Sequence, residues 1–264
     1  MEKQLAKIIG IARHRLSTDG DGVTTLVAFH GCPLSCRYCL NPQSLGDGGR
    51  FREYSPEELY AETRIDELYF IATNGGVTFG GGEPGLRPQF IREFRESCGP
   101  AWQLNLETSL NVPTANIAAL LPVVNTLIID IKDINTDIYR DYTGQSNDLV
   151  LDNLRLIAET GRQSDCIVRL PLIPNYNTDA NRENSCNTLE TLGYSKVVGP
   201  ISQHDGRTLA AKWRKRARTK ATDVMVKMLH AAKKAGLSAQ HACLIPGFSP
   251  AVLQSDCTKK KASS

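Results

Sequence analysis

The sequence has no apolar run of the roughly 20 residues that a membrane-spanning helix requires. Residues 1–16 are basic and mildly amphipathic, and they lack the long apolar core and small-residue cleavage site of a secretory signal. The net charge of +3 is too small to indicate nucleic acid by itself. Disorder is also excluded, because 41% of the residues are hydrophobic. We therefore expect a folded cytoplasmic protein without a membrane or nucleic-acid partner.

Positive charge is unevenly distributed and is concentrated toward the C-terminal end. Seven basic residues fall between positions 207 and 220 with no acidic residue among them, and a second cluster occupies residues 259–261. The simplest interpretation is a solvated helix face followed by a disordered end. A docking surface for an acidic protein is a second interpretation. Nucleic acid ranks third, because Trp213 is the one aromatic residue in this stretch on which a base could stack.

Strand-like and helix-like segments alternate along the chain, which indicates a mainly parallel sheet. Six strands are expected, at residues 24–30, 76–79, 102–108, 123–132, 166–173 and 195–201. Helices are expected at residues 55–72, 88–98, 114–121, 148–160, 180–192 and 219–235, the first of them with a capping box from Ser55 to Glu58. Six strands are too few for an eight-fold barrel, so we predict an α/β fold with a partial, open (β/α)6 TIM-like barrel. Ligands should bind at the C-terminal ends of its strands.

Three of the eight cysteines, Cys32, Cys36 and Cys39, lie within eight residues directly after the first expected strand. Thiolates are soft ligands that select iron–sulfur clusters, zinc or copper(I). A [4Fe–4S] cluster ordinarily takes four cysteines, so three leave one iron open, and an open metal position is typical of catalysis. Zinc bound by these cysteines and His30 is the alternative. The other five cysteines are interpreted as ordinary thiols, because we expect a reducing compartment.

Polar residues stand at the expected C-terminal ends of several strands. Gly81, Gly82 and Glu83 follow the second strand; glycines allow a close backbone approach to a ligand, and Glu83 can accept from an ammonium group. The charged residues near the ends of the next three strands are Glu107, Asp130, Lys132 and Arg169. A polar face inside a barrel is costly unless it lines a wet cavity, so these residues indicate one site. The alternative is that each forms only a local ion pair, such as Asp130 with Lys132.

The spacing of the three cysteines, with aromatic Tyr38 before the last of them, resembles the signature of the radical S-adenosylmethionine superfamily. The resemblance implies one [4Fe–4S] cluster whose open iron is chelated by S-adenosylmethionine. An electron from the cluster then cleaves that cofactor to methionine and a 5′-deoxyadenosyl radical. Because residues 39–80 contain no cysteine beyond Cys39 itself, no auxiliary cluster is expected.

The segments taken in order resemble glycyl-radical-enzyme activating enzymes of the pyruvate formate-lyase type. The matching segments are residues 18–23, 39–42, 76–83, 107–109, 129–132, 142–144, 152–154, 168–174 and 200–204. The resemblance implies an anaerobic oxidoreductase of the [formate-C-acetyltransferase]-activating type that removes a hydrogen from one glycine of a partner enzyme. It also implies a monomer that receives electrons from a flavodoxin or ferredoxin.

The resemblance assigns roles by position. Cys32, Cys36 and Cys39 would hold the cluster, with no catalytic residue beyond the cluster and S-adenosylmethionine. The cofactor would be bound by Tyr38, Gly81, Gly82, Glu83, Glu107, Asp130, Lys132, Arg169 and His204. The acidic residues of the third and fourth strands would also hold a monovalent cation. The chain would form a single domain over residues 1–264, with a core at about 18–204, a basic helical extension at 205–254 and a frayed tail at 255–264.

Three departures from the family pattern concern partner recognition and local backbone. Thr24 replaces an arginine, Asn175 replaces a glycine, and the segment after residue 200 runs into the basic stretch. Two other functions therefore stay open. One is a radical enzyme of the same superfamily that modifies a small molecule or peptide. The other is a non-catalytic metal-binding protein, which iron content and cofactor cleavage would distinguish.

Overall fold

The computed structural model describes residues 4–16, 18–46 and 48–198, and every structural statement below concerns these residues. The chain divides into two units, residues 1–217 and 218–264, and all described residues belong to the first. His204, the expected helix 219–235, the basic stretch, the extension 205–254 and the tail 255–264 lie outside the described residues.

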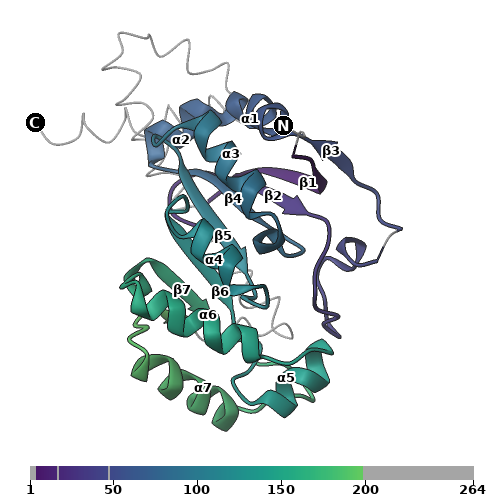
Figure 1. Cartoon of the computed structure of the whole chain (residues 1–264), viewed down its shortest axis with the longest axis vertical. Helices are drawn as coiled ribbons and strands as arrows, with labels where there is room; N and C mark the ends of the chain where they lie inside the picture. Colours follow the sequence, from purple (N-terminus) through teal and green to yellow (C-terminus); the bar gives the residue numbers. More distant parts are fainter. Residues whose placement is uncertain (1–3, 17, 47, 199–264) are drawn as a thin grey trace, which may run out of the picture. The chain divides into compact units, whose positions relative to one another are not determined.

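The described residues form one eight-stranded sheet (Figure 1). Its strands are β1 (Ala6–Arg15), β2 (Thr24–Phe29), β3 (Arg52–Tyr54), β4 (Gly76–Gly81), β5 (Gln103–Thr108), β6 (Thr126–Asp130), β7 (Cys166–Arg169) and β8 (Val197–Val198). Their order is β3-β1-β2-β4-β5-β6-β7-β8, and the six from β2 onward are parallel. This confirms the predicted α/β fold with six parallel strands in an unclosed, partial barrel.

The prediction that the sheet begins at residue 24 is wrong. Two strands, β1 and β3, precede or interrupt the parallel series, and β1 pairs antiparallel with both β2 and β3. Only Ala6 and Ile8 of β1 are buried, and the rest of the strand is half-buried or exposed. Strands near the edge of a sheet bury little, so their apolar alternation is weak and easily missed.

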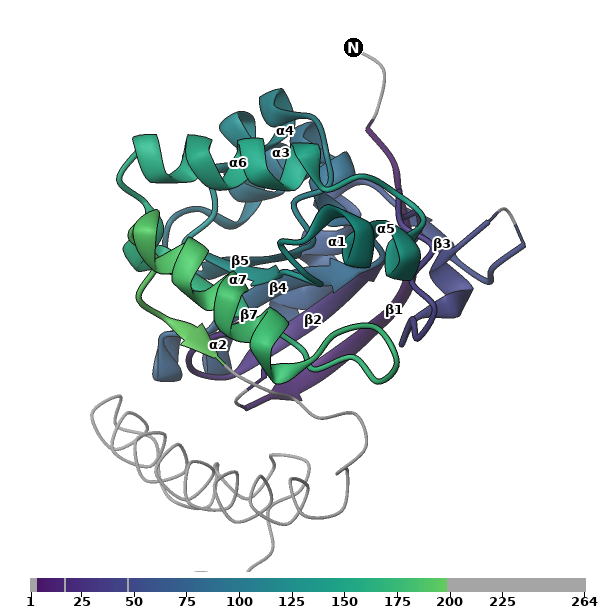
Figure 2. The same cartoon turned by 90° about the horizontal axis from the view of Figure 1, so that it is seen from below.

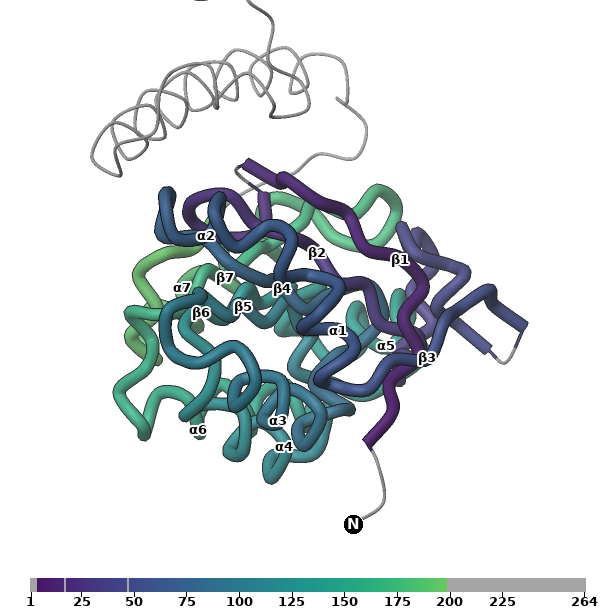
Figure 3. Tube along the Cα trace, turned by 90° about the horizontal axis from the view of Figure 1, so that it is seen from above, coloured from purple at the N-terminus to yellow at the C-terminus, as the bar shows by residue number. Residues whose placement is uncertain are grey.

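Helices cover the outer face of the curved sheet, where Figures 2 and 3 show α3, α4 and α6 grouped together. The helices are α1 (Pro56–Thr63), α2 (Glu67–Thr73), α3 (Pro88–Cys98), α4 (Thr114–Leu120), α5 (Thr136–Thr143), α6 (Asp148–Glu159) and α7 (Asp179–Thr191). None within the described residues has both the length and the apolar character needed to cross a membrane. The Ser55–Glu58 capping box is confirmed, although a 3-10 turn at Arg64–Asp66 divides the expected helix 55–72.

Helix α5 was not predicted from the sequence. It buries Tyr139, Tyr142 and Thr143, which share one helix face, but its eight residues are too few for the helical period to be recognised in the sequence. The signal that could have found it is Asn135, whose side chain accepts hydrogen bonds from the backbone N–H groups of Asp137 (3.0 Å) and Ile138 (3.1 Å). Asparagine is a favoured residue at this capping position.

The two faces of the strands carry different residues, and this difference creates the site. On the outer face, Phe79 packs between Phe29 (ring centroids 5.8 Å apart) and Phe94 (5.3 Å). Side chains alternate along a strand, so the neighbours of such core residues point to the inner face. Thr78 and Asn105 are two of these inner residues, and both are buried. The predicted alternation of β5 thus leaves a polar inner surface.

Candidate functional site

The cysteine loop, residues 30–46, follows β2 and is held by the end of α5. The backbone N–H of Ser35 donates to the carbonyl of Thr143 (2.8 Å), and that of Arg37 donates to the carbonyl of Tyr142 (3.1 Å). The last carbonyls of a helix have no partner within the helix, so they are available to a neighbouring segment. The residue between the two anchored positions is Cys36. Helix α5 therefore fixes the backbone on both sides of the middle cysteine.

The cysteine loop is also joined to the glycine-rich end of β4. The Asn41 side chain donates to the carbonyl of Gly81 (3.1 Å), and the Glu83 backbone N–H donates to the carbonyl of Gly31 (2.8 Å). A Cβ atom on Gly82 would lie 2.3 Å from the Gly31 carbonyl oxygen. Glycine is therefore required at position 82, because only a residue without a side chain lets the two segments approach this closely.

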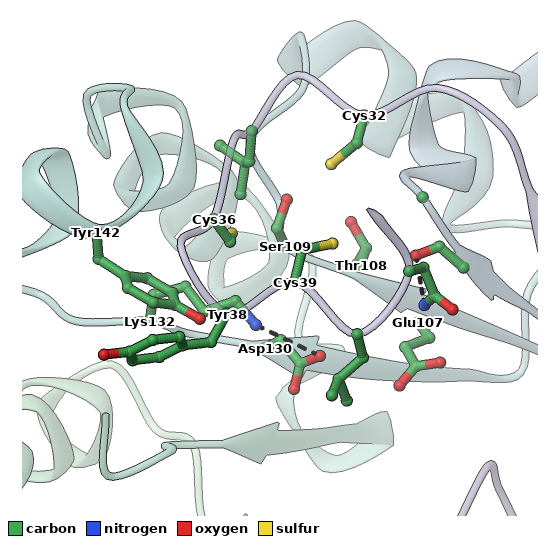
Figure 4. A pocket seen from close by; sticks show the side chains of 15 residues that line it. Cys32, Cys36, Tyr38, Cys39, Glu107, Thr108, Ser109, Asp130, Lys132 and Tyr142 are labelled. Carbon is green, nitrogen blue, oxygen red and sulfur yellow. Dashed lines mark hydrogen bonds and ion pairs between the residues drawn. The ribbon is translucent and has the colours of Figure 1, made fainter. Parts of the chain in front are cut away.

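A cavity of about 170 Å³ lies between the cysteine loop and the ends of the strands (Figure 4). Many of the predicted residues line it together: Cys32, Cys36, Cys39, Tyr38, Gly81, Gly82, Glu107, Asp130 and Lys132. The described lining contains three cysteines and no fourth. Three soft thiolate ligands fit a [4Fe–4S] cluster, since they would hold three of its irons and leave the fourth without a protein ligand.

Burial affects the protonation of two of the cavity thiols, Cys32 and Cys36. It raises the pKa of Cys32 to about 12 and also raises the pKa of Cys36, where the nearby Lys132 opposes the shift. In the metal-free protein these two thiols should therefore be protonated, and iron binding must release their protons. His30, the fourth ligand of the zinc alternative, does not line the cavity; its ring packs against Phe51, with centroids 5.1 Å apart.

Glu83 lies behind the cavity wall rather than on it. Its side chain is 1% exposed, and its carboxylate accepts from the Thr108 hydroxyl (2.7 Å), the Ser109 hydroxyl (2.7 Å), the Ser109 N–H (2.8 Å) and the Gly85 N–H (3.0 Å). These bonds join the end of β4 to the end of β5. The assignment of Glu83 to the cofactor's amino group stays a prediction; Gly81 and Gly82 line the cavity, and Glu83 does not.

Glu83 also makes the stability of the metal-free protein depend on pH. Burial raises its pKa, and the hydrogen bonds from Ser109, Thr108 and Gly85 oppose the shift without cancelling it. The folded state then holds the proton more tightly than the unfolded state, so this group costs stability as pH rises above about 4.3, the usual pKa of glutamate. Glu83→Gln removes the titration. The free energy of unfolding of the Glu83→Gln variant, measured in urea, should therefore rise relative to that of wild type between about pH 4 and pH 7.

The control for this prediction is Glu159→Gln on α6, at an exposed position. The difference in the free energy of unfolding between this variant and wild type should change little over the same pH range. If the free energy of unfolding of Glu83→Gln fell relative to wild type as pH rose, the assigned direction of the pKa shift of Glu83 would be wrong.

The strand-end charges form one network across three neighbouring strands. The Arg169 guanidinium pairs with the Glu107 carboxylate and lies 3.9 Å from Asp130 Oδ1. Lys132 Nζ lies 3.8 Å from Asp130 Oδ2, as Figure 4 shows. The local pair of Asp130 with Lys132 is thus present, and it belongs to a larger group at the cavity. Arg169 itself does not line the cavity, but the Glu107 and Asp130 carboxylates with which it interacts do.

Several lining residues were not assigned to the site from the sequence. They are Leu34, Leu40, Asn41, Thr108, Ser109 and Tyr142. A usable signal existed for Thr108 and Ser109, which directly follow Glu107 at a strand end. Tyr142 begins the matching segment 142–144, although no role was assigned to it. It lies on the unpredicted helix α5, where its ring packs 6.1 Å from that of Tyr38. The predicted ligand His204 lies outside the described residues.

Comparison with known proteins is consistent with this geometry. The Radical SAM superfamily matches residues 26–185 of the chain. The (2S)-3-sulfopropanediol dehydratase activating enzyme of Klebsiella oxytoca is 29% identical, over 61% of this chain and 69% of the relative. The pyruvate formate-lyase 2-activating enzyme of Escherichia coli (strain K12) is 29% identical, over 71% and 73%. The indoleacetate decarboxylase activating enzyme of Tractidigestivibacter scatoligenes is 39% identical, over 62% and 72%. The chain is therefore an enzyme of the radical SAM superfamily and belongs, within it, to the activating enzymes.

Proposed function

We propose that this enzyme abstracts a hydrogen atom from one glycine of a partner glycyl-radical enzyme, using a [4Fe–4S] cluster and S-adenosylmethionine. The observation that carries the proposal is the arrangement of three cysteines around the same cavity as the strand-end charges. The relatives named above support an activating role by their names, which refer to a dehydratase, a formate-lyase and a decarboxylase. Because these targets differ, the relatives do not select one partner.

The cavity residues have separate tasks in this proposal. Cys32, Cys36 and Cys39 would hold three irons of the cluster and leave the fourth to the cofactor. With both groups bound, the chemistry supplied is one-electron cleavage of the sulfonium to a 5′-deoxyadenosyl radical that can take hydrogen from a glycine Cα. Gly81 and Gly82 line the cavity, and because they have no side chains they would allow the methionine part of the cofactor to approach the backbone closely.

The charged residues would orient the rest of the cofactor. Lys132 is suited to pair with a carboxylate, because it lines the cavity and is only 20% exposed. Glu107 and Asp130 are suited to accept hydrogen bonds from ribose hydroxyls. A monovalent cation held by the same two carboxylates would have to compete with Arg169 and Lys132, which already pair with them.

The remaining features of the proposal concern the setting of the enzyme. An iron–sulfur cluster with an open iron is sensitive to oxygen, so we place the activity under anaerobic conditions. We also place the enzyme in the cytoplasm. A flavodoxin or ferredoxin is the proposed electron donor, and a monomer is the proposed active form. The proposed domain organisation is one domain over residues 1–264 with its core at about 18–204.

The test uses enzyme that has been reconstituted with iron and sulfide anaerobically and then reduced. The probe is a synthetic Arg-Val-Ser-Gly-Tyr peptide whose glycine carries two deuterium atoms at Cα. We expect 5′-deoxyadenosine that contains deuterium, detected by mass spectrometry. A matched peptide with Cα-deuterated alanine in place of glycine should transfer none.

The other outcomes separate the competing functions. Unlabelled 5′-deoxyadenosine with both peptides would contradict glycine abstraction and favour a small-molecule or other peptide substrate. Absence of 5′-deoxyadenosine from iron-loaded enzyme would contradict radical chemistry altogether and favour a non-catalytic metal-binding protein.

A further inference from the structure

Residues 18–20, here called the N-terminal turn, connect β1 to β2 and contact the inner face of the sheet. The carbonyl of Asp19 accepts hydrogen bonds from the Thr78 hydroxyl on β4 and from the Asn105 side chain on β5 (3.2 Å). Gly20 has a φ of +117°, and a Cβ atom there would lie 2.2 Å from Asn105 Nδ2. A side chain at position 20 is therefore excluded, and the turn is held tightly against two strands.

The turn also contains a buried charge. Asp19 is 3% exposed, and its carboxylate pairs with the Arg15 guanidinium at 2.5 Å. A buried carboxylate is costly unless a cation and hydrogen bonds compensate it. The Arg15 side chain, at the end of β1, is 40% exposed. The conformation of the turn thus depends on an ion pair that reaches from solvent to the interior of the barrel.

Arg169 connects this turn to the cavity. Its Nη2 donates to the carbonyl of Thr18, while its Nη1 pairs with Glu107 and lies 3.9 Å from Asp130 Oδ1. The side chain is 17% exposed. A guanidinium group is planar and presents its donors in a fixed fork, so the position of the Thr18 carbonyl constrains the donors that face the two carboxylates.

We propose that the N-terminal turn is a positioning element for the cavity, because it fixes the guanidinium of Arg169 and thereby the carboxylates of Glu107 and Asp130. Charges alternate along this path, from Arg15 through Asp19 and Arg169 to Glu107. The inference rests on the proposed function, since it assumes that S-adenosylmethionine is the ligand of the cavity. Asp19 is a positioning residue in this account and touches no cofactor.

The test compares Asp19→Asn with Asp21→Asn, a matched change at an exposed residue two positions away. In reconstituted enzyme, we expect Asp19→Asn to weaken S-adenosylmethionine binding by about tenfold, the size typical of coupled neighbouring sites. Asp21→Asn should bind as wild type does. Equilibrium binding gives the affinity, and the change in the electron paramagnetic resonance spectrum of the reduced cluster on adding cofactor gives an independent signature. Iron content should be equal in all three proteins.

A double-mutant cycle tests whether the effect passes through Arg169. If the turn acts by positioning this residue, Arg169→Lys and the double variant with Asp19→Asn should have the same affinity. If the two losses multiply, the turn acts independently and the proposal is wrong. Should Asp19→Asn fail to fold, Thr78→Val removes a hydrogen bond to the turn without changing a charge. It should weaken binding in the same direction, and wild-type affinity in that variant would also overturn the proposal.

The two proposals fail in different ways. If wild-type enzyme does not bind S-adenosylmethionine, the proposed function is wrong. If wild type binds it and Asp19→Asn binds equally well with the same spectral change, only the positioning role is wrong.

Discussion

Cys36→Ala is expected to abolish both cluster assembly and the cleavage of S-adenosylmethionine. Cys36 is the middle cysteine of the loop, and its side chain lines the cavity between two backbone anchors on α5. Two remaining thiolates cannot hold a cluster that ordinarily requires cysteine at each protein-bound iron. Iron should fall from about four atoms per chain to less than one, with loss of the iron–sulfur absorbance. Production of 5′-deoxyadenosine should fall below detection.

The control for this variant is Cys186→Ala on α7. The Cys186 thiol is half-buried and lies 3.6 Å from the Glu190 carboxylate, away from the cavity lining. Its iron content and cleavage rate should match wild type. If Cys36→Ala kept its cluster and its activity, the assignment of the three-cysteine site would be wrong.

Lys132→Met is expected to weaken S-adenosylmethionine binding by a factor of about 30 or more. Lys132 is the one cationic side chain in the described lining of the cavity, and it lies 3.8 Å from Asp130 Oδ2. Methionine keeps most of the apolar volume but would leave the carboxylate that we propose to pair with Lys132 without a cation. Removing one partner of a buried charge pair typically costs about 2–5 kcal/mol, and 1.4 kcal/mol corresponds to tenfold in affinity. Equilibrium binding to reconstituted enzyme measures the effect.

Lys196→Met provides the matched control for that measurement. Lys196 is exposed, and its ammonium group donates to the carbonyl of Ser164 (2.6 Å), outside the cavity lining. Binding should be unchanged in this variant. Wild-type affinity in Lys132→Met would exclude contact between this lysine and the bound cofactor, while iron content verifies that the cluster is present in both variants.

The parallel strands could be predicted because the residue pattern within each strand indicates a strand by itself. In β5, buried Leu104 and Leu106 alternate with polar residues, and this period of two survives in any tertiary context that buries one face. Strand β1 and helix α5 were not predicted, because neither shows such a clear pattern. The first buries only Ala6 and Ile8, and the second buries tyrosines and a threonine. Most of β1 is half-buried or exposed, and α5 spans only eight residues, so local pattern does not distinguish these segments from loops.

The candidate site shows the same division between local and long-range information. By itself, the sequence determined that Cys32, Cys36 and Cys39 share one loop, because residues so close along the chain are close in any fold. Only the tertiary structure decided that Glu83 turns into the wall of the cavity. It also decided that Arg169 reaches back 151 residues to the carbonyl of Thr18. Such contacts depend on how strands and turns are placed relative to one another, and no local pattern of residues encodes that placement.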